Sequence, residues 1–315
     1  MKADNIKTVV KIGDNYIDLA EVKSGPNEAY NGSVMLCHAS VNPNGYLYRY
    51  MPLEAFVDML RTGMNTLTSA YIQEDKYEGG LFAIQAKFDK TEIDALVECG
   101  LSYINKSLDE NNKYRPFLKE LKNLYFQSWT KKENCEGMWK AYSNSGKTRI
   151  VKIKCKAGDI LNSLVSNAGK DNVQKCFLGS VIYIPKDEYI SEIKNIVIRD
   201  SSTISKIGAG VASDHILKRD DYKYENEVRV LYMHYLADEQ EDNPTGLQIN
   251  KGKCLKYKIK DDSHTYCLLP IQEVVLDPWT KEYYVDSIKD MLNKYGISPD
   301  IVKRSDYFDD VLQVV

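Results

Sequence analysis

The chain has few histidines and no closely spaced cysteines, the residues on which most structural metal sites and disulfide frameworks depend. Only four of its 315 residues are histidine, and none shows the H-x-H or H-E-x-x-H spacing of a zinc site. The seven cysteines are odd in number, widely scattered and free of any C-x-x-C pair. We therefore expect neither a metal centre nor a disulfide-stapled domain, and scattered reduced cysteines fit a cytoplasmic protein.

Long hydrophobic runs and a large net charge are also missing. No stretch approaches 18 apolar residues, and the first 16 residues contain no apolar segment of signal-peptide length. We therefore expect no membrane association. The formal net charge of −3 provides no general field that would attract nucleic acid or anionic lipid. Any binding of a phosphate group must then depend on a local cluster of residues.

The composition, with 43% hydrophobic and 28% charged residues, is that of a globular chain long enough for a sizeable core. Its clearest helix signal follows Pro52, where Phe56, Met59 and Leu60 recur at i, i+3 and i+4 and Gly63 stands at the C-terminal cap. Further helices are predicted at 91–108, 115–125, 136–143, 159–165, 186–198 and 281–296. Strands are predicted at 8–12, 15–22, 47–50, 125–129, 148–155, 176–185, 224–234, 254–260, 273–278 and 300–305, and a loop at 200–222.

This order of elements predicts an α+β fold with a helical block at about 50–125 followed by a mainly β region. No internal repeat is visible, and no linker is long or polar enough to require a domain boundary. We therefore predict a single domain over residues 1–315, with an N-terminal hairpin at 1–30 and a helical insertion at about 90–125.

The segment Y-E-N-E-V-R-V at 224–230 places two glutamates one residue apart in a strand-like pattern. Positions i and i+2 of a strand face the same way, so Glu225 and Glu227 should lie side by side and repel each other. Either this face is open to water and Arg229 balances the charge, or the carboxylate pair performs chemistry.

Two earlier segments carry residues that suit a bound ligand. Arg49 lies mid-strand beside Tyr48, and an arginine facing inward needs an anion, either a carboxylate or a phosphate. Ser128 and Thr130 place two hydroxyls on one strand face, where they either satisfy local hydrogen bonds or orient a ligand.

The segment M-W-K-A-Y-S at 138–143 brings two large aromatic residues, Trp139 and Tyr142, close together. Aromatic side chains of this kind are usually part of the core. The alternative is an aromatic wall that stacks on a flat ligand, next to the residues above.

Three short blocks, Leu47–Tyr50, Met138–Tyr142 and Tyr224–Arg229, occur in an order that resembles a bacterial family known as domain of unknown function 2971. The resemblance spans about residues 46–300. It suggests a setting in bacterial conflict, phage defence or stress response.

The order Arg, then Ser-x-Thr, then Glu-x-Glu is also similar to the pattern of the arginine–serine–glutamate ADP-ribosyltransferases. This resemblance implies a split β core, with NAD as substrate and a protein or nucleic acid as acceptor. It implies that Arg49 grips the dinucleotide, Ser128 shapes the nicotinamide-ribose pocket and Glu227 is catalytic, while Glu225 serves the acceptor. Either NAD-dependent ADP-ribosyl transfer or NAD hydrolysis is then expected. Two alternatives are a non-catalytic ligand-sensing domain that uses the same cleft and a nuclease or phosphotransferase acting on nucleic acid.

Overall fold

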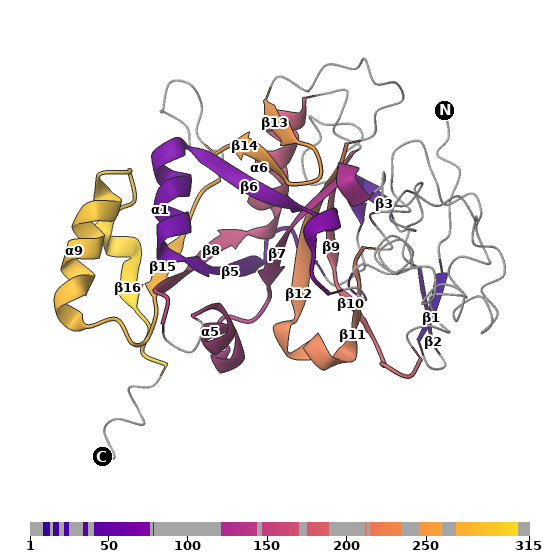
Figure 1. The fold of residues 1–315 in the computed structure, drawn as a ribbon, viewed down its shortest axis with the longest axis horizontal. Coiled ribbons are helices and arrows are strands. Elements are labelled where there is room, and N and C mark those ends of the chain that lie inside the picture. Colours follow the sequence, from indigo (N-terminus) through magenta and orange to yellow (C-terminus); the bar gives the residue numbers. More distant parts are fainter. Residues whose placement is uncertain are drawn as a thin grey trace.

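Figure 1 shows the chain as a computed structural model. The structure describes residues 9–12, 15–18, 22–24, 34–36, 41–75, 78, 121–143, 147–169, 175–188, 212, 215–234, 246–259 and 269–307. Within these ranges, mixed α and β elements surround one large sheet, which confirms the predicted α+β class.

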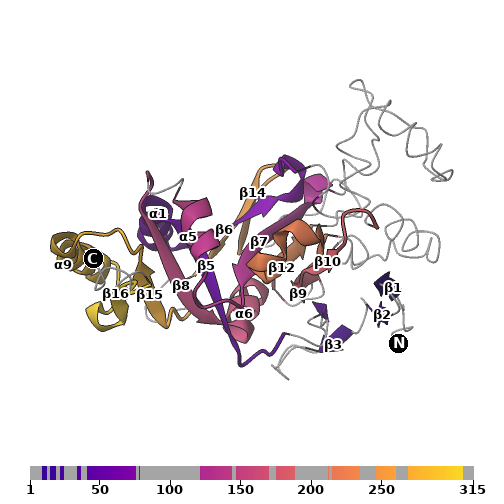
Figure 2. The ribbon, with the colours of Figure 1, turned by 90° about the horizontal axis from the view of Figure 1, so that it is seen from below.

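The large sheet forms the centre of the described residues (Figures 1 and 2). Its main path runs through β13 (Leu247–Asn250), β14 (Cys254–Lys258), β6 (Met64–Ser69), β7 (Leu124–Thr130), β5 (Tyr46–Pro52), β8 (Ile150–Lys156), β15 (Glu273–Leu276) and β16 (Val302–Arg304). Beside β7, two further strands complete it, β12 (Glu227–Met233) and β9 (Cys176–Ser180). All the pairings are antiparallel except that of β15 with β16.

The sheet forks at β7. Along β7, β12 pairs with every residue. In contrast, β6 pairs with β7 at Tyr125 and Phe126, and β5 pairs with it at Thr130. Because β5 and β6 meet opposite ends of the same strand, they diverge, and the sheet divides into a β6–β14–β13 branch and a β5–β8–β15–β16 branch.

Helices cover the sheet on either side of this fork. In the part of the chain that the structure describes, the helices are α1 (Leu53–Thr62), α5 (Glu136–Tyr142), α6 (Ala157–Ala168) and α9 (Glu282–Asn293), with short 3-10 turns η1 (Ala70–Ile72), η3 (Asp220–Glu225) and η4 (Pro299–Ile301). Contacts join α1 to β5, β6 and β8, and α6 to β8, β9 and β14. At one end of the molecule, α9 packs with β16 and η4 (Figure 1).

Several predicted elements are confirmed. In α1, Phe56, Met59 and Leu60 are buried and Gly63 adopts a left-handed φ of 65° at the C-terminal cap. The N-terminal hairpin is present as β1 (Val9–Ile12) paired with β2 (Asn15–Asp18), and β3 (Val22–Ser24) pairs with β4 (Val34–Leu36).

Three predictions about the course of the chain need correction. The helical block at about 50–125 is interrupted by β6, because Gly63 ends α1 and the next six residues alternate between more and less buried positions. The strand predicted at 176–185 is divided at Val181 into β9 and β10 (Ile182–Ile184). The loop predicted at 200–222 contains β11 (Leu217–Arg219), which pairs in parallel with β10, and the first half of η3. The predicted helical insertion at about 90–125 lies mostly outside the described residues, and the helix at 186–198 does so from residue 189 onward.

The core lies between the sheet and its helices. Its largest fully buried side chains include Trp129, Trp139, Tyr125 and Tyr232, together with one charged residue, Arg229. Within the described ranges, no helix combines the length and the apolar character needed to cross a membrane. A fully buried arginine in the core directs attention to the elements around β12.

Candidate functional site

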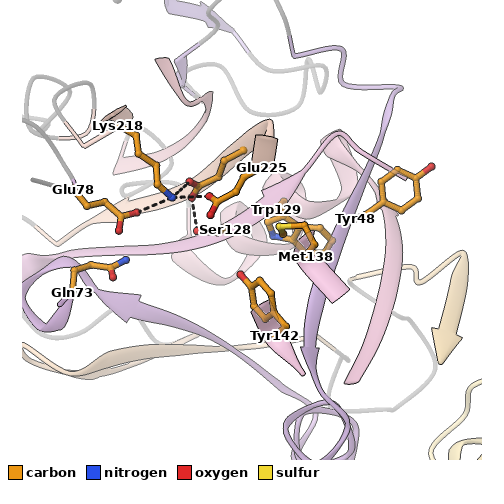
Figure 3. Close-up of a pocket in the computed structure, with 10 residues that line it drawn as sticks. Tyr48, Gln73, Glu78, Ser128, Trp129, Met138, Tyr142, Lys218 and Glu225 are labelled. Carbon is orange, nitrogen blue, oxygen red and sulfur yellow. Dashed lines mark hydrogen bonds and ion pairs between the residues drawn. The ribbon is translucent and has the colours of Figure 1, made fainter. Parts of the chain in front are cut away.

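A pocket of about 210 Å³ opens where β7, β11 and β12 meet α5 (Figure 3). Its walls carry three carboxylates, one ammonium group and a cluster of aromatic and amide side chains. The lining residues are Tyr48, Gln73, Glu78, Ser128, Trp129, Met138, Tyr142, Lys218, Glu225 and Glu227.

The register of β7 and β12 places Ser128 and Glu227 together. Arg229 lies directly opposite Ser128, and Glu227 lies opposite Thr130. Because residues two apart on a strand face the same way, Ser128, Glu227 and Arg229 share one face of the sheet. Ser128 Oγ donates a hydrogen bond of 2.5 Å to Glu227 Oε1, so these two residues are in direct contact.

Glu225 reaches the same pocket, but not for the reason that the sequence pattern gave. It ends the 3-10 turn η3, and β12 begins only at Glu227. Between them Asn226 takes a left-handed φ of 44°, a conformation that asparagine tolerates better than most residues. The two carboxylates are joined by Lys218, whose Nζ lies 2.6 Å from Glu225 Oε2 and 3.1 Å from Glu227 Oε2.

Arg229 balances part of the buried negative charge. Its Nε lies 2.7 Å from Glu227 Oε1, its Nη1 donates to the carbonyl of His215 at 2.5 Å, and its Nη2 contacts Glu78. Lys218 Nζ is also 3.6 Å from Glu78. The predicted pairing of Arg229 with Glu227 is therefore present. Three carboxylates share two cations, which leaves one net negative charge when all five groups are ionised.

The two glutamates have opposite pKa shifts. Burial alone would raise the pKa of Glu227, but the charges of Arg229 and Lys218 and the hydrogen bonds from Arg229 and Ser128 outweigh it, so that pKa lies below its usual range. For Glu225, burial is the largest effect and outweighs the attraction of Lys218, so its pKa lies above the usual range. Glu227 is thus held ionised, while Glu225 can take up a proton more readily.

These shifts predict opposite pH trends for two single substitutions. A lowered folded-state pKa gives stability that is present above the unfolded value, near 4.5, and is lost as the pH falls through the folded value. The loss of folding stability caused by Glu227→Gln should therefore be largest near pH 6. As the pH falls toward 2, the stability of this variant should approach that of wild type. A raised folded-state pKa gives stability that is present at low pH and is lost as the pH rises. The folding stability of Glu225→Gln, relative to wild type, should therefore be higher at pH 7 than at pH 4. Melting temperatures measured from pH 2.5 to 8 on both variants check this, and parallel curves would contradict it.

Arg49 lies outside the lining of the pocket, in the fork of the sheet. Its Nη1 donates to Asn65 Oδ1 at 3.2 Å, and Asn65 in turn donates to the hydroxyl of Tyr257 at 2.7 Å. Burial lowers the pKa of Arg49, while the charge of Arg49 acts to lower the pKa of Tyr142 on the pocket wall. The structure therefore places Arg49 close enough to influence Tyr142 electrostatically, without showing it beside Ser128 or Glu227.

The other predicted ligand-binding residues divide between pocket and core. Tyr48 and Tyr142 line the pocket. Thr130 Oγ1 donates to the backbone carbonyl of Glu225 at 2.5 Å, so it supports the turn that presents that glutamate. Trp139 is fully buried and packs edge to face against Tyr50 at a ring-centroid distance of 4.8 Å, the core position that is usual for an aromatic residue.

Three residues of the pocket wall, Lys218, Glu78 and Gln73, were not predicted from the sequence. Lys218 lies within the stretch that was interpreted as a loop. The apolar pair Ile216 and Leu217 just before it was the available signal, since both are buried and Leu217 begins β11. Glu78 reaches the cluster from a distant part of the sequence, and no local pattern marks it. Among the described residues, no group of three or more histidine, cysteine, aspartate or glutamate side chains is arranged to hold a metal ion.

Residues 138–230 match the model of a family described as protein of unknown function (DUF2971). This range begins in α5 and ends within β12, so it contains Tyr142, Lys218, Glu225, Glu227 and Arg229. The match supports the resemblance drawn from the segments 138–142 and 224–229, which both lie inside it. Comparisons with curated proteins and with solved structures gave no match.

Proposed function

We propose that the pocket carries out NAD-dependent ADP-ribosyl transfer or NAD hydrolysis. The observation that supports this most strongly is the meeting of two carboxylates with opposite pKa shifts, Glu225 and Glu227, in one small pocket beside the hydroxyl of Ser128. Pairs of titratable groups whose surroundings separate their pKa values mark a division of acid–base roles.

The charge of the pocket suits the chemistry of a glycosidic bond. When the bond between ribose C1 and the nicotinamide nitrogen breaks, nicotinamide leaves with the electron pair and positive charge develops on the ribose. Glu227, kept ionised by its neighbours, would stabilise that charge as it forms. The acceptor oxygen or nitrogen then bonds to C1 and releases a proton, which Glu225 would take.

The size of the pocket fits one part of a dinucleotide. A volume of about 210 Å³ is below the roughly 300–1,000 Å³ usual for whole-ligand pockets, so a ribose with its attached ring would occupy it. The rest of the ligand would extend past Tyr142 toward Arg49. The hydrogen bond from Arg49 to a neutral amide, in place of a carboxylate, leaves its positive charge suited to a diphosphate.

A split β core is also what the resemblance to ADP-ribosyltransferases implies. The divergence of β5 and β6 from β7 supports this finer assignment of the fold, because Arg49 stands on one branch and Ser128 on the strand where the branches separate. We propose an ADP-ribosyltransferase-like core on this basis.

A second candidate is a non-catalytic domain that binds a ligand in the same pocket. One observation favours it: the carboxylate of Glu227 already receives hydrogen bonds or ion pairs from Ser128, Lys218 and Arg229. A carboxylate so fully engaged would need to release a partner before it could contact a ribose.

Incubation of the purified protein with NAD labelled in the nicotinamide ring separates the two candidates. The transferase proposal predicts release of free nicotinamide that stops when the pocket is altered. If NAD binds but stays intact over hours in the presence of varied acceptors, the binding-only candidate holds.

Tyr142 offers a test that hardly disturbs the fold. Its side chain lines the pocket and is 40% exposed, so its removal should cost less than about 1 kcal/mol of stability. Loss of its ring should weaken NAD binding by roughly 2–10-fold, the scale of one aromatic contact. Calorimetric titration of NAD into Tyr142→Ala measures this. The control is Tyr283→Ala, a more exposed tyrosine on α9 outside the pocket, which should leave NAD affinity unchanged.

A further inference from the structure

Lys218 occupies the centre of the ionic cluster. Its ammonium nitrogen lies 2.6 Å from Glu225, 3.1 Å from Glu227 and 3.6 Å from Glu78, and its side chain is only 8% exposed (Figure 3). The nitrogen also lies 4.6 Å from the centre of the Tyr222 ring. A lysine so buried and so fully paired has a fixed position.

Both cations contact Glu227 and Glu78, but they differ at Glu225. Arg229 contacts Glu227 and Glu78, while Glu225 has its ion pair with Lys218. Glu227 would therefore keep Arg229 and Ser128 if Lys218 were lost. Glu225 would lose the ion pair that the structure shows for it and would remain next to the negative charge of Glu227 and Glu78.

We infer that Lys218 is a positioning residue that holds Glu225 beside Glu227 and favours the carboxylate form of Glu225, which can accept a proton. That the proton comes from an acceptor rests on the proposed function. The effect of the Lys218 charge on the ionisation of Glu225, called the charge relation below, is independent of that function.

The surroundings of Glu225 act in both directions. Burial and the charges of Glu227 and Glu78 raise the pKa of Glu225, and Lys218 lowers it. Among the described residues, the titratable and charged groups near Glu225 are Glu78, Tyr142, Tyr183, Lys218, Tyr222, Tyr224, Glu227 and Arg229. Because most of these are neutral or negative at pH 7, the ammonium group of Lys218 has the largest share in keeping Glu225 ionised.

The test replaces Lys218 with methionine, which has similar length and no charge, and with arginine, which keeps the charge. The protein is labelled with 13C at the glutamate carboxyl groups, and Glu225→Gln identifies the signal of Glu225. Its titration midpoint should rise by at least about one pH unit in Lys218→Met, a tenfold gain in proton affinity, and by less than half of that in Lys218→Arg. An unchanged midpoint in Lys218→Met would overturn the inference.

A second variant keeps the test decisive if Lys218→Met does not fold. Combining it with Glu78→Gln removes one negative charge and restores the net charge of the cluster to that of wild type. The midpoint of Glu225 in this double variant should then lie at least about one unit above that in Glu78→Gln alone. Equal midpoints would overturn the inference.

Nicotinamide release separates this inference from the proposed function. If the wild type releases nicotinamide, the acid limb of the pH profile of transfer should shift to higher pH in Lys218→Met. The shift should equal that of the titration midpoint of Glu225. An acid limb that does not shift would overturn the role of Lys218 in transfer. If the wild type releases none while the midpoint of Glu225 still shifts, the proposed function fails and the charge relation holds.

Discussion

Replacing Glu227 with glutamine should lower nicotinamide release from NAD by roughly 10²–10³-fold, the scale expected when one preorganised electrostatic group is removed. The substitution keeps the shape of the side chain and removes its charge. In the structure this charge is held in place by Arg229, Lys218 and Ser128. Single-turnover release of labelled nicotinamide measures the change in the chemical step.

Stability must be measured on the same variant, because Glu227 is 4% exposed and paired with Arg229. Replacing Glu227 should therefore lower the melting temperature, whereas replacing a glutamate that faces open solvent should not. Activity is therefore compared at a temperature where both proteins are fully folded. Release within threefold of wild type under those conditions would mean that Glu227 serves the fold alone.

Glu225→Gln provides the matched control on the neighbouring carboxylate. Its proposed task is to receive the proton of the acceptor, so it should reduce transfer to an acceptor more than hydrolysis of NAD. Equal losses of both reactions in Glu225→Gln would argue against separate roles for the two residues.

Local patterns were sufficient to predict much of the fold. The helical spacing of Phe56, Met59 and Leu60, with Gly63 after it, fixed α1 because all its signals lie within one short stretch. In contrast, β6 and β11 were missed. Each is short, and each forms by pairing with strands distant in the sequence, β14 and β7 for β6 and β10 for β11, so the local pattern did not identify either strand.

The site was predictable in part. The contact between Ser128 and Glu227 followed from two strand patterns that the fold brings into register. The closeness of Glu225 to Glu227 was foreseen from strand alternation, but it depends on the left-handed turn at Asn226 and on Lys218. Ion pairs between distant segments leave no periodic trace in a sequence, so the partners of a buried charge appear only in three dimensions.

A buried cluster of five ionised groups is a costly way to fill a core. Withdrawing each charge from water costs several kcal/mol, and apolar residues of similar volume often give equal or greater stability. Strongly perturbed carboxyl groups that also line a pocket are typical of functional sites. The placement of Lys218, Glu225 and Glu227 on a pocket wall, with Arg229 fully buried behind them, is consistent with that use of the charge.

Replacing Arg229 with methionine should cost about 3–5 kcal/mol of folding stability, the largest loss that we expect from a single substitution in this cluster. Arg229 has no exposed surface, and its guanidinium group satisfies Glu227, Glu78 and the carbonyl of His215. Its removal takes one donor from each of two carboxylates and from a carbonyl in a buried site, and it leaves Lys218 as the one cation of the cluster. Urea unfolding at pH 7, followed by tryptophan fluorescence and circular dichroism, measures the change in free energy.

Arg61→Met is the matched control, since it removes the same group from an exposed ion pair. Arg61 lies 2.5 Å from Asp58 on α1, with 61% and 52% of the two side chains exposed, so its loss should cost less than about 1 kcal/mol. The double variant Arg229→Met with Glu227→Gln should recover part of the stability lost in Arg229→Met, because one uncompensated carboxylate is then neutral. If Arg229→Met costs no more than Arg61→Met, the guanidinium group does not hold the carboxylates, and the fixed ionic state of Glu227 needs another cause.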